Sequence, residues 1–151
     1  MNSAYGRSAC RSVRWVTMLR TAVRSQLLHW GMGELADDAA LVLSELAANA
    51  ILHGEPPVRV AVTLRCARGD PLAVRIEVTD CGPAFDVDAV RAHWRHPAFS
   101  LGEEGRGLYV VDAVSRDWGD RPTAGGHTVW AELAIAVRGG SPPAPGPGQA
   151  S

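Results

Sequence analysis

Three polar residues at intervals of four, Glu45, Asn49 and His53, are the first candidates for chemistry in this chain. Residues four apart lie above one another on one face of an α-helix, so a helix here lines up a carboxylate, a carboxamide and an imidazole. Carboxylate and carboxamide oxygens suit a hydrated Mg²⁺ ion, although a solvated polar face explains the row more simply. The opposite face carries apolar residues at helical spacing, namely Ala39, Leu43, Leu46, Ala47, Ala50 and Ile51.

Asp80 is the second candidate, because it stands at the end of a predicted strand. Residues 72–78 alternate between apolar and more polar side chains, which is the period of a half-buried strand. Asp80 shares the parity of the apolar residues, so a continuing strand points its carboxylate to the core side. An unpaired charge is costly there, and we therefore expect a donor for it, either a backbone amide or a ligand.

The third candidate is the sequence Gly105-Arg106-Gly107-Leu108, which opens a predicted helix. The free amides and the positive dipole end of a helix start attract anions, and glycines let a phosphate approach the backbone. This stretch is therefore predicted to border phosphate groups.

Together the three candidates provide for each part of a nucleotide. Asp80 offers an acceptor for an exocyclic amine such as that of adenine. Asn49 can hold Mg²⁺ bridging the phosphates, since Mg²⁺ keeps few protein ligands. Glu45, one turn away, can take a proton from an attacking hydroxyl or water.

The elements that must position these residues follow from periodicity and from turn residues. Tight turns join the strands, so we predict a mixed, mainly antiparallel sheet covered on one face by helices, that is, a two-layer α+β sandwich. Strand–helix alternation and a GxGxxG after a strand are both missing, which argues against a Rossmann fold. The predicted helices are 9–30, 37–53 (with Asp37 or Asp38 as its N-cap), 86–95 and one from Gly105, and the predicted strands are 58–66, 72–80, one from Trp118, and 128–137.

Length and composition place the chain among ordinary globular proteins. Its 151 residues allow one domain, which we expect over residues 9–138, after a loose stretch 1–8 and before a disordered Pro/Gly-rich tail 139–151. A net charge of −1 does not suggest nucleic acid or a membrane surface as a partner. Three cysteines without a CxxC pair favour a reducing cytoplasm over a disulfide framework or a zinc site.

The motifs resemble those of the Bergerat ATP-binding fold, which gyrase B subunits, ninety-kilodalton heat-shock chaperones, histidine kinases and MutL proteins share. Glu45-x-x-x-Asn49-Ala50 resembles the N box of that fold. Asp80-x-Gly82 resembles the first glycine box, and Gly105-x-Gly107-Leu108 resembles the second. Within the superfamily the chain looks most like the small anti-sigma factor serine/threonine kinases of actinobacteria, over about residues 9–137.

The resemblance implies an ATP-dependent switch that needs Mg²⁺. Proteins of this group bind a sigma factor, phosphorylate a serine or threonine on an anti-anti-sigma partner, and form homodimers. By matching position, the resemblance implies Glu45 as catalytic base and Asn49 as Mg²⁺ ligand. It implies the following residues around ATP: Asn49, Asp80 at the adenine amine, Gly82 making room, Thr128 at the adenine end, and Gly105, Arg106, Gly107 and Leu108 at the phosphates.

The sequence also departs from the family pattern. Ala84 stands where the first glycine box has a second glycine, and Glu103 and Glu104 stand where a basic residue precedes the second box. Like charges near a phosphate are unfavourable. The alternative reading is therefore a catalytically weak or inactive module that binds ATP or a protein partner.

Overall fold

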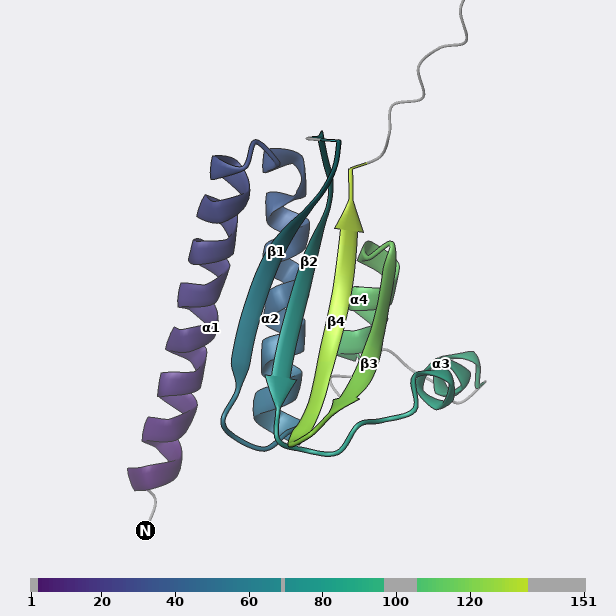
Figure 1. The fold of residues 1–151 in the computed structure, drawn as a ribbon. Coiled ribbons are helices and arrows are strands. Elements are labelled where there is room, and N and C mark those ends of the chain that lie inside the picture. Colours follow the sequence, from purple (N-terminus) through teal and green to yellow (C-terminus); the bar gives the residue numbers. More distant parts are fainter. Residues whose placement is uncertain (1–2, 69, 97–105, 136–151) are drawn as a thin grey trace, which may run out of the picture.

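The computed structural model describes residues 3–68, 70–96 and 106–135. Along the chain they form two helices, two strands, two further helices and two further strands (Figure 1). Gly105, Glu103, Glu104 and the predicted tail 139–151 lie outside the described residues. No helix in the described ranges is long and apolar enough to cross a membrane.

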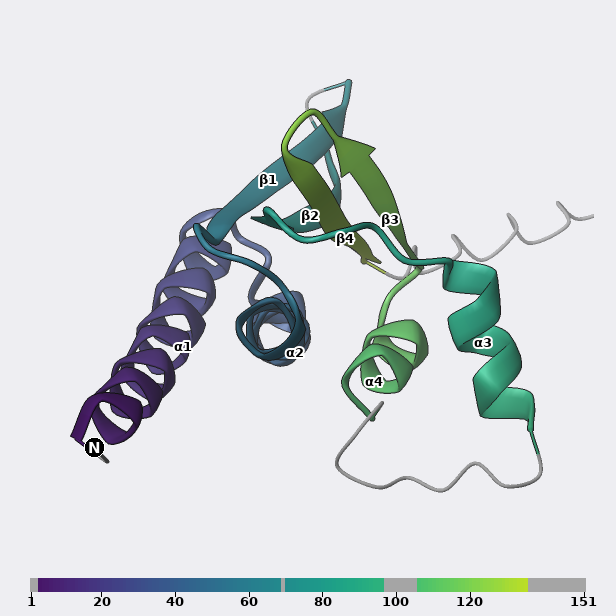
Figure 2. The same cartoon turned by 90° about the horizontal axis from the view of Figure 1, so that it is seen from below.

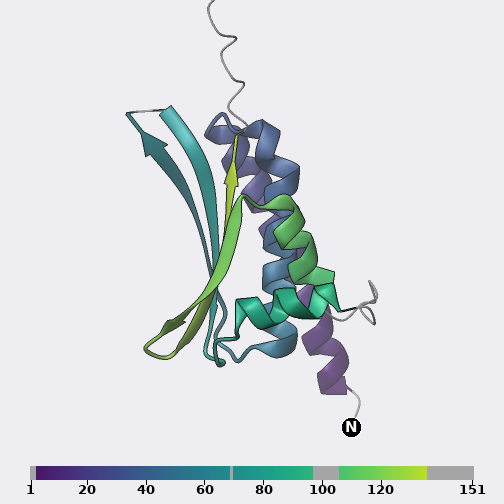
Figure 3. The same cartoon turned by 90° about the vertical axis from the view of Figure 1, so that its right-hand side faces the viewer.

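The four strands form one antiparallel sheet in the order β1-β2-β4-β3. All helices lie on one side of this sheet (Figure 3), so the predicted two-layer α+β sandwich is confirmed. Every pair of described strands is antiparallel, in agreement with the prediction of a mainly antiparallel sheet. The strands are β1 (Arg59–Ala67), β2 (Asp70–Asp80), β3 (Asp117–Thr123) and β4 (Gly126–Ala134).

Alternation along β2 sets which side chains face the helices. Val74, Ile76 and Val78 are fully buried, whereas the intervening Arg75 and Glu77 are half-buried on the other face and form an ion pair at 3.0 Å. Register carries this alternation across the sheet, since residues directly opposite one another on paired strands share a face. Asp80 pairs with His127 and Thr79 pairs with Thr128 in that register.

Helix α1 (Ser3–His29) begins earlier than predicted. Residues 3–8, which we expect to be loose from the sequence, are helical. The helix ends as predicted at glycine: Gly31 has φ +73°, and the Met32 amide donates to the Leu27 carbonyl at 2.8 Å. A positive φ next to such a bond is a common helix termination, and glycine adopts it without steric cost.

Helix α2 (Ala36–His53) starts from the 3₁₀-helix η1 (Gly33–Leu35) and not from an aspartate cap. Its N-cap is Leu35, which makes no side-chain cap hydrogen bond, so the prediction of Asp37 or Asp38 as N-cap is wrong. Asp37 instead accepts a hydrogen bond from Arg24 of α1 at 3.2 Å. Both acidic residues still lie in the first turn, where their charge suits the helix dipole.

The core lies between the sheet and α1, α2 and α4 (Arg106–Val114). Leu43 and Leu46 of α2 pack there with Ile76 and Leu133 of the sheet and Val111 of α4, all at most 1% exposed. Helix α3 (Val87–Arg95) contributes only partly buried side chains. Its N-cap Asp86 accepts hydrogen bonds from two backbone amides of the first turn, Asp88 at 2.9 Å and Ala89 at 3.3 Å.

Candidate nucleotide site

Helix α2 carries Glu45 and Asn49 on its polar side. Both side chains are half-buried, whereas His53, the third residue of the row, is exposed. The apolar side of the helix faces the sheet, and its residues Leu46, Ala47 and Ala50 are at most 5% exposed. The helix therefore holds Glu45 and Asn49 at the edge of the core.

The start of α4 lies against Glu45. Helices α2 and α4 are in contact beneath the sheet (Figure 2). A Cβ added to Gly107 would stand 2.9 Å from Glu45 Oε2, so only a residue without a side chain leaves the carboxylate in place. Arg106 is exposed, Leu108 packs partly buried against the core, and Gly105 lies outside the described residues. The structure thus brings Glu45 together with Arg106-Gly107-Leu108.

Asp80 is buried, with 3% of its surface exposed, as its strand parity predicts. Its Oδ1 accepts hydrogen bonds from the Gly82 amide at 2.7 Å and the Glu55 amide at 3.3 Å. A Cβ on Gly82 would stand 2.8 Å from the same oxygen, so glycine permits this close approach. Two backbone amides therefore supply part of the hydrogen bonding that the sequence leads us to expect for the Asp80 carboxylate.

Sequence reasoning did not find the other partner of Asp80. His127 of β4 is buried and places Nε2 3.0 Å from Asp80 Oδ2, while its Nδ1 lies 2.8 Å from Asp120 Oδ1 of β3. The sequence did offer one signal: His127 has the same parity as Val129 and Ala131, which are predicted to point inward. The register that sets His127 opposite Asp80 could not be read from the sequence.

Thr128 lies on the wrong face for the role that the resemblance implies. Its hydroxyl lies 2.7 Å from the Thr79 hydroxyl, on the side of the sheet opposite Asp80 and His127. The expectation that Thr128 supports the adenine end is therefore wrong for its side chain. The inward position beside Asp80 belongs to His127.

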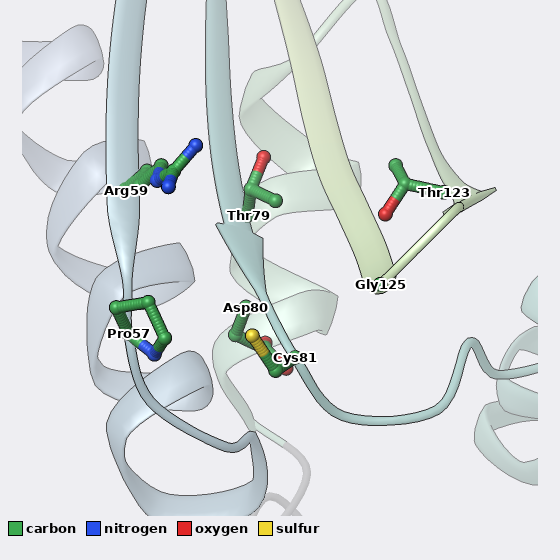
Figure 4. A pocket seen from close by; sticks show the side chains of 7 residues that line it. All are labelled: Pro57, Arg59, Thr79, Asp80, Cys81, Thr123 and Gly125. Atoms are coloured by element: carbon green, nitrogen blue, oxygen red, sulfur yellow. The ribbon is translucent and has the colours of Figure 1, made fainter.

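A hollow of about 210 Å³ lies around the same end of the sheet. Arg59 of β1 and Thr79 of β2 border it, and the β3–β4 turn closes it (Figure 4). Thr79 belongs to the face of the sheet that the helices leave uncovered, so this hollow is separate from the group formed by Glu45, Asn49 and Gly107. It is lined by Pro57, Arg59, Thr79, Asp80, Cys81, Thr123 and Gly125.

The residues present fit Mg²⁺ and ATP on chemical grounds. Asn49 supplies an amide oxygen, and Mg²⁺ commonly takes one or two protein ligands with the remainder from phosphate and water. Within the described residues no group of three or more His, Cys, Asp and Glu side chains is arranged to hold a metal ion. Asp80 is a buried acceptor, and Gly107 leaves room at a helix start.

Comparison with known proteins identifies the family of this chain. Residues 11–133 match the family described as histidine kinase-like ATPase domain. No curated protein matches the chain.

Two of the solved structures that are similar to this chain have a TM-score of 0.44 each. The catalytic domain of histidine kinase ThkA is 17% identical, with 66% of each chain covered. The histidine kinase domain of the blue-light activated kinase EL346 from Erythrobacter litoralis is 16% identical, with 80% of this chain and 59% of that chain covered. This chain thus spans 66% of the length of the first structure and 59% of the second. Because the family match extends over most of the chain and includes the helix, strand end and helix start described above, this protein belongs to the histidine kinase-like ATPase domain family.

Proposed function

We propose that this protein is an ATP-binding regulator that acts as an anti-sigma factor and phosphorylates a serine or threonine of an anti-anti-sigma partner. The observation that carries the proposal is the contact between Glu45 and Gly107. It sets a carboxylate beside the start of α4, where amides and the helix dipole favour phosphate. A base next to a phosphate site is the arrangement that transfer to a hydroxyl requires.

Each residue has a role that its position supports. Bound Mg·ATP supplies the phosphoryl group, and Asn49 is the residue that would hold the ion. Asp80 accepts from the adenine amine, and Gly82 leaves space beside it. Arg106, Gly107 and Leu108 border the phosphates, with the Arg106 guanidinium as the cation, and the motif assigns the same role to Gly105, which lies outside the described residues. Glu45 takes the proton from the partner's hydroxyl.

The second candidate is a module that binds ATP without useful transfer. Two features favour it: Ala84 replaces a glycine of the first box, and Asp80 already accepts from three donors within the chain. A carboxylate has about four acceptor positions, so the adenine amine has one left. Binding under this reading is weaker, and the protein acts by contact with its partner.

Calorimetric titration with Mg·ATP is the first experiment. Saturable binding supports both candidates, whereas no binding at millimolar nucleotide sinks both. The next step is incubation with labelled ATP and purified anti-anti-sigma candidates. Transfer to a serine or threonine supports the kinase. Binding of the partner without transfer, at saturating Mg·ATP, supports the module.

Glu45→Gln separates the two candidates further, because it keeps the shape of the side chain and removes the base. Under the kinase proposal it lowers transfer at least about hundredfold while ATP still binds. The control is Glu34→Gln, the same change at an exposed residue of η1, which leaves transfer unchanged. Equal transfer by Glu45→Gln and the unaltered protein would rule out Glu45 as the base.

The partners and the assembly belong to the same proposal. A sigma factor is the target that the protein holds inactive, and the active form is a cytoplasmic homodimer. Co-purification with the sigma factor in the presence of Mg·ATP tests the first point, and light scattering tests the second. A monomer at micromolar concentration would contradict the dimer alone.

A further inference from the structure

Asp80, His127 and Asp120 form a buried row that joins three strands. The side chains of His127, Asp80 and Asp120 are 5%, 3% and 0% exposed. His127 stands between the carboxylates, with Nε2 3.0 Å from Asp80 Oδ2 and Nδ1 2.8 and 2.9 Å from the two oxygens of Asp120. The histidine is therefore the bridge between β2 and β3, which are not neighbours in the sheet.

The two ring nitrogens of His127 face different carboxylates, so the ring is held from both sides. A side chain that lacks either ring nitrogen loses the contact to one of the two carboxylates. The orientations of Asp80 and Asp120 therefore depend on the same ring.

The same two carboxylates hold both ends of the segment Gly82–Phe85. The Gly82 amide donates to Asp80 Oδ1 and the Phe85 amide donates to Asp120 Oδ2, each at 2.7 Å. The Phe85 ring meets the His127 ring edge-on, with centroids 5.9 Å apart. The next residue, Asp86, is the N-cap of α3. The start of α3 is thus fixed by the row.

We propose that His127 is a positioning residue that couples recognition of the base at Asp80 to the segment Gly82–Phe85 and the start of α3. This inference rests on the proposed binding of ATP with Asp80 at the adenine amine. His127 holds Oδ2 of Asp80 in one orientation, and through Asp120 the same ring holds the Phe85 amide. A base that binds Asp80 therefore tightens the segment.

The test combines ATP affinity with amide exchange in the full chain. In the unaltered protein, ATP slows hydrogen exchange of the Phe85 amide. The amide of His127→Gln cannot reach both carboxylates as the two ring nitrogens do, so ATP affinity falls about tenfold and the Phe85 amide no longer responds to ATP. The control His29→Gln, the same change at an exposed histidine, alters neither measurement.

Two further variants keep the test decisive. Asp120→Asn keeps the shape of the side chain but replaces one acceptor oxygen with a donor, and it weakens the response of Phe85 even if His127→Gln fails to fold. His127→Lys supplies three donors at this position and recovers affinity relative to His127→Gln. Recovery by lysine separates positioning of Asp80 from simple filling of the core.

A further, spectroscopic measurement does not depend on ATP binding. Nitrogen NMR of the His127 ring is expected to show both ring nitrogens in hydrogen bonds, and a ring nitrogen without a hydrogen-bond partner would overturn the bridge. Failure of the unaltered protein to bind Mg·ATP would overturn the proposed function and this coupling together. Normal affinity and an unchanged Phe85 response in His127→Gln and Asp120→Asn would overturn the coupling alone.

Discussion

The carboxylate of Glu45 and the Cα of Gly107 lie so close together that a side chain at Gly107 would meet Glu45 Oε2 at 2.9 Å. This contact joins α2 to the start of α4. The obstacle is the far end of a flexible side chain, so the carboxylate can turn aside at small cost. Position 107 therefore controls where the carboxylate of Glu45 points more than it controls folding.

Gly107→Ala is expected to separate stability from catalysis. Its free energy of unfolding stays within about 1 kcal/mol, because alanine also has the higher helix propensity. Under the proposed kinase function, phosphoryl transfer falls at least about tenfold, because the carboxylate of Glu45, the proposed base, is displaced. Thermal unfolding and the labelled-ATP assay measure the two effects. Gly125→Ala, where an added Cβ meets nothing within 4 Å, is the matched control and changes neither.

Leu43 and Leu41 lie two positions apart in α2 and differ in burial. Leu43 is 1% exposed and Leu41 is 37% exposed. Leu43→Ala is expected to lower the free energy of unfolding by about 2–5 kcal/mol, through lost burial and a residual cavity. Leu41→Ala costs less than about 1 kcal/mol. Urea unfolding measures both, and equal costs would contradict the core assigned to α2.

Substitution by alanine is expected to destabilise the protein at Gly126 and to leave its stability nearly unchanged at Gly125. A Cβ on Gly126 would collide with the Asp80 carbonyl and stand 2.6 Å from Cys81 Cα, both of them backbone atoms. Gly126→Ala therefore costs about 1–3 kcal/mol or more, whereas Gly125→Ala stays within about 0.5 kcal/mol. Thermal unfolding distinguishes them. A stable Gly126→Ala variant would show that the end of β2 is farther from β4.

Asp112 of α4 fastens the helix to β3. Its Oδ1 accepts from the Trp118 indole at 2.8 Å, and Arg91 of α3 lies 3.4 Å away. Trp118 is 3% exposed, so Asp112→Ala leaves a buried N–H without its partner and costs about 1–3 kcal/mol. Chemical unfolding measures this cost.

Two variants separate the two contacts of Asp112. Asp112→Asn keeps an acceptor and recovers most of the loss. Arg91→Ala removes a partly exposed ion pair and a guanidinium 5.2 Å from the centroid of the Trp118 ring, and it costs about 1 kcal/mol. A larger effect for Arg91→Ala than for Asp112→Ala would contradict the account.

Periodicity was enough to predict the faces of the strands and the polar row of α2. Val74, Ile76, Val78 and Asp80 are buried as their shared parity requires. In α1 not every apolar side chain is buried: Val13 and Met18 are 67% and 68% exposed, because the helix packs on α2 along a narrow stripe that includes Val23 and Leu27. The apolar pattern of one helix does not reveal how much of that helix its packing partner covers.

Long-range register is what the sequence could not supply. Asp80 and His127 are 47 residues apart, and only the pairing of β2 with β4 brings them together. Asp37 was predicted as a cap because its type and place suit one, yet an arginine on another helix, Arg24, holds it. Both cases depend on tertiary neighbours that local propensity does not encode. The role of Gly105 stays a prediction.

The strand order has a consequence for how the protein folds. The β1–β2 and β3–β4 hairpins join strands close in sequence, whereas the central β2–β4 ladder must close a long stretch of chain. Local pairs form early and distant pairs late, because loop closure costs entropy before contacts compensate for it. The junction of Asp80 with His127 is therefore expected to form after the two hairpins. A chain that has both hairpins but not the β2–β4 ladder would lack this junction, on which the proposed nucleotide site depends.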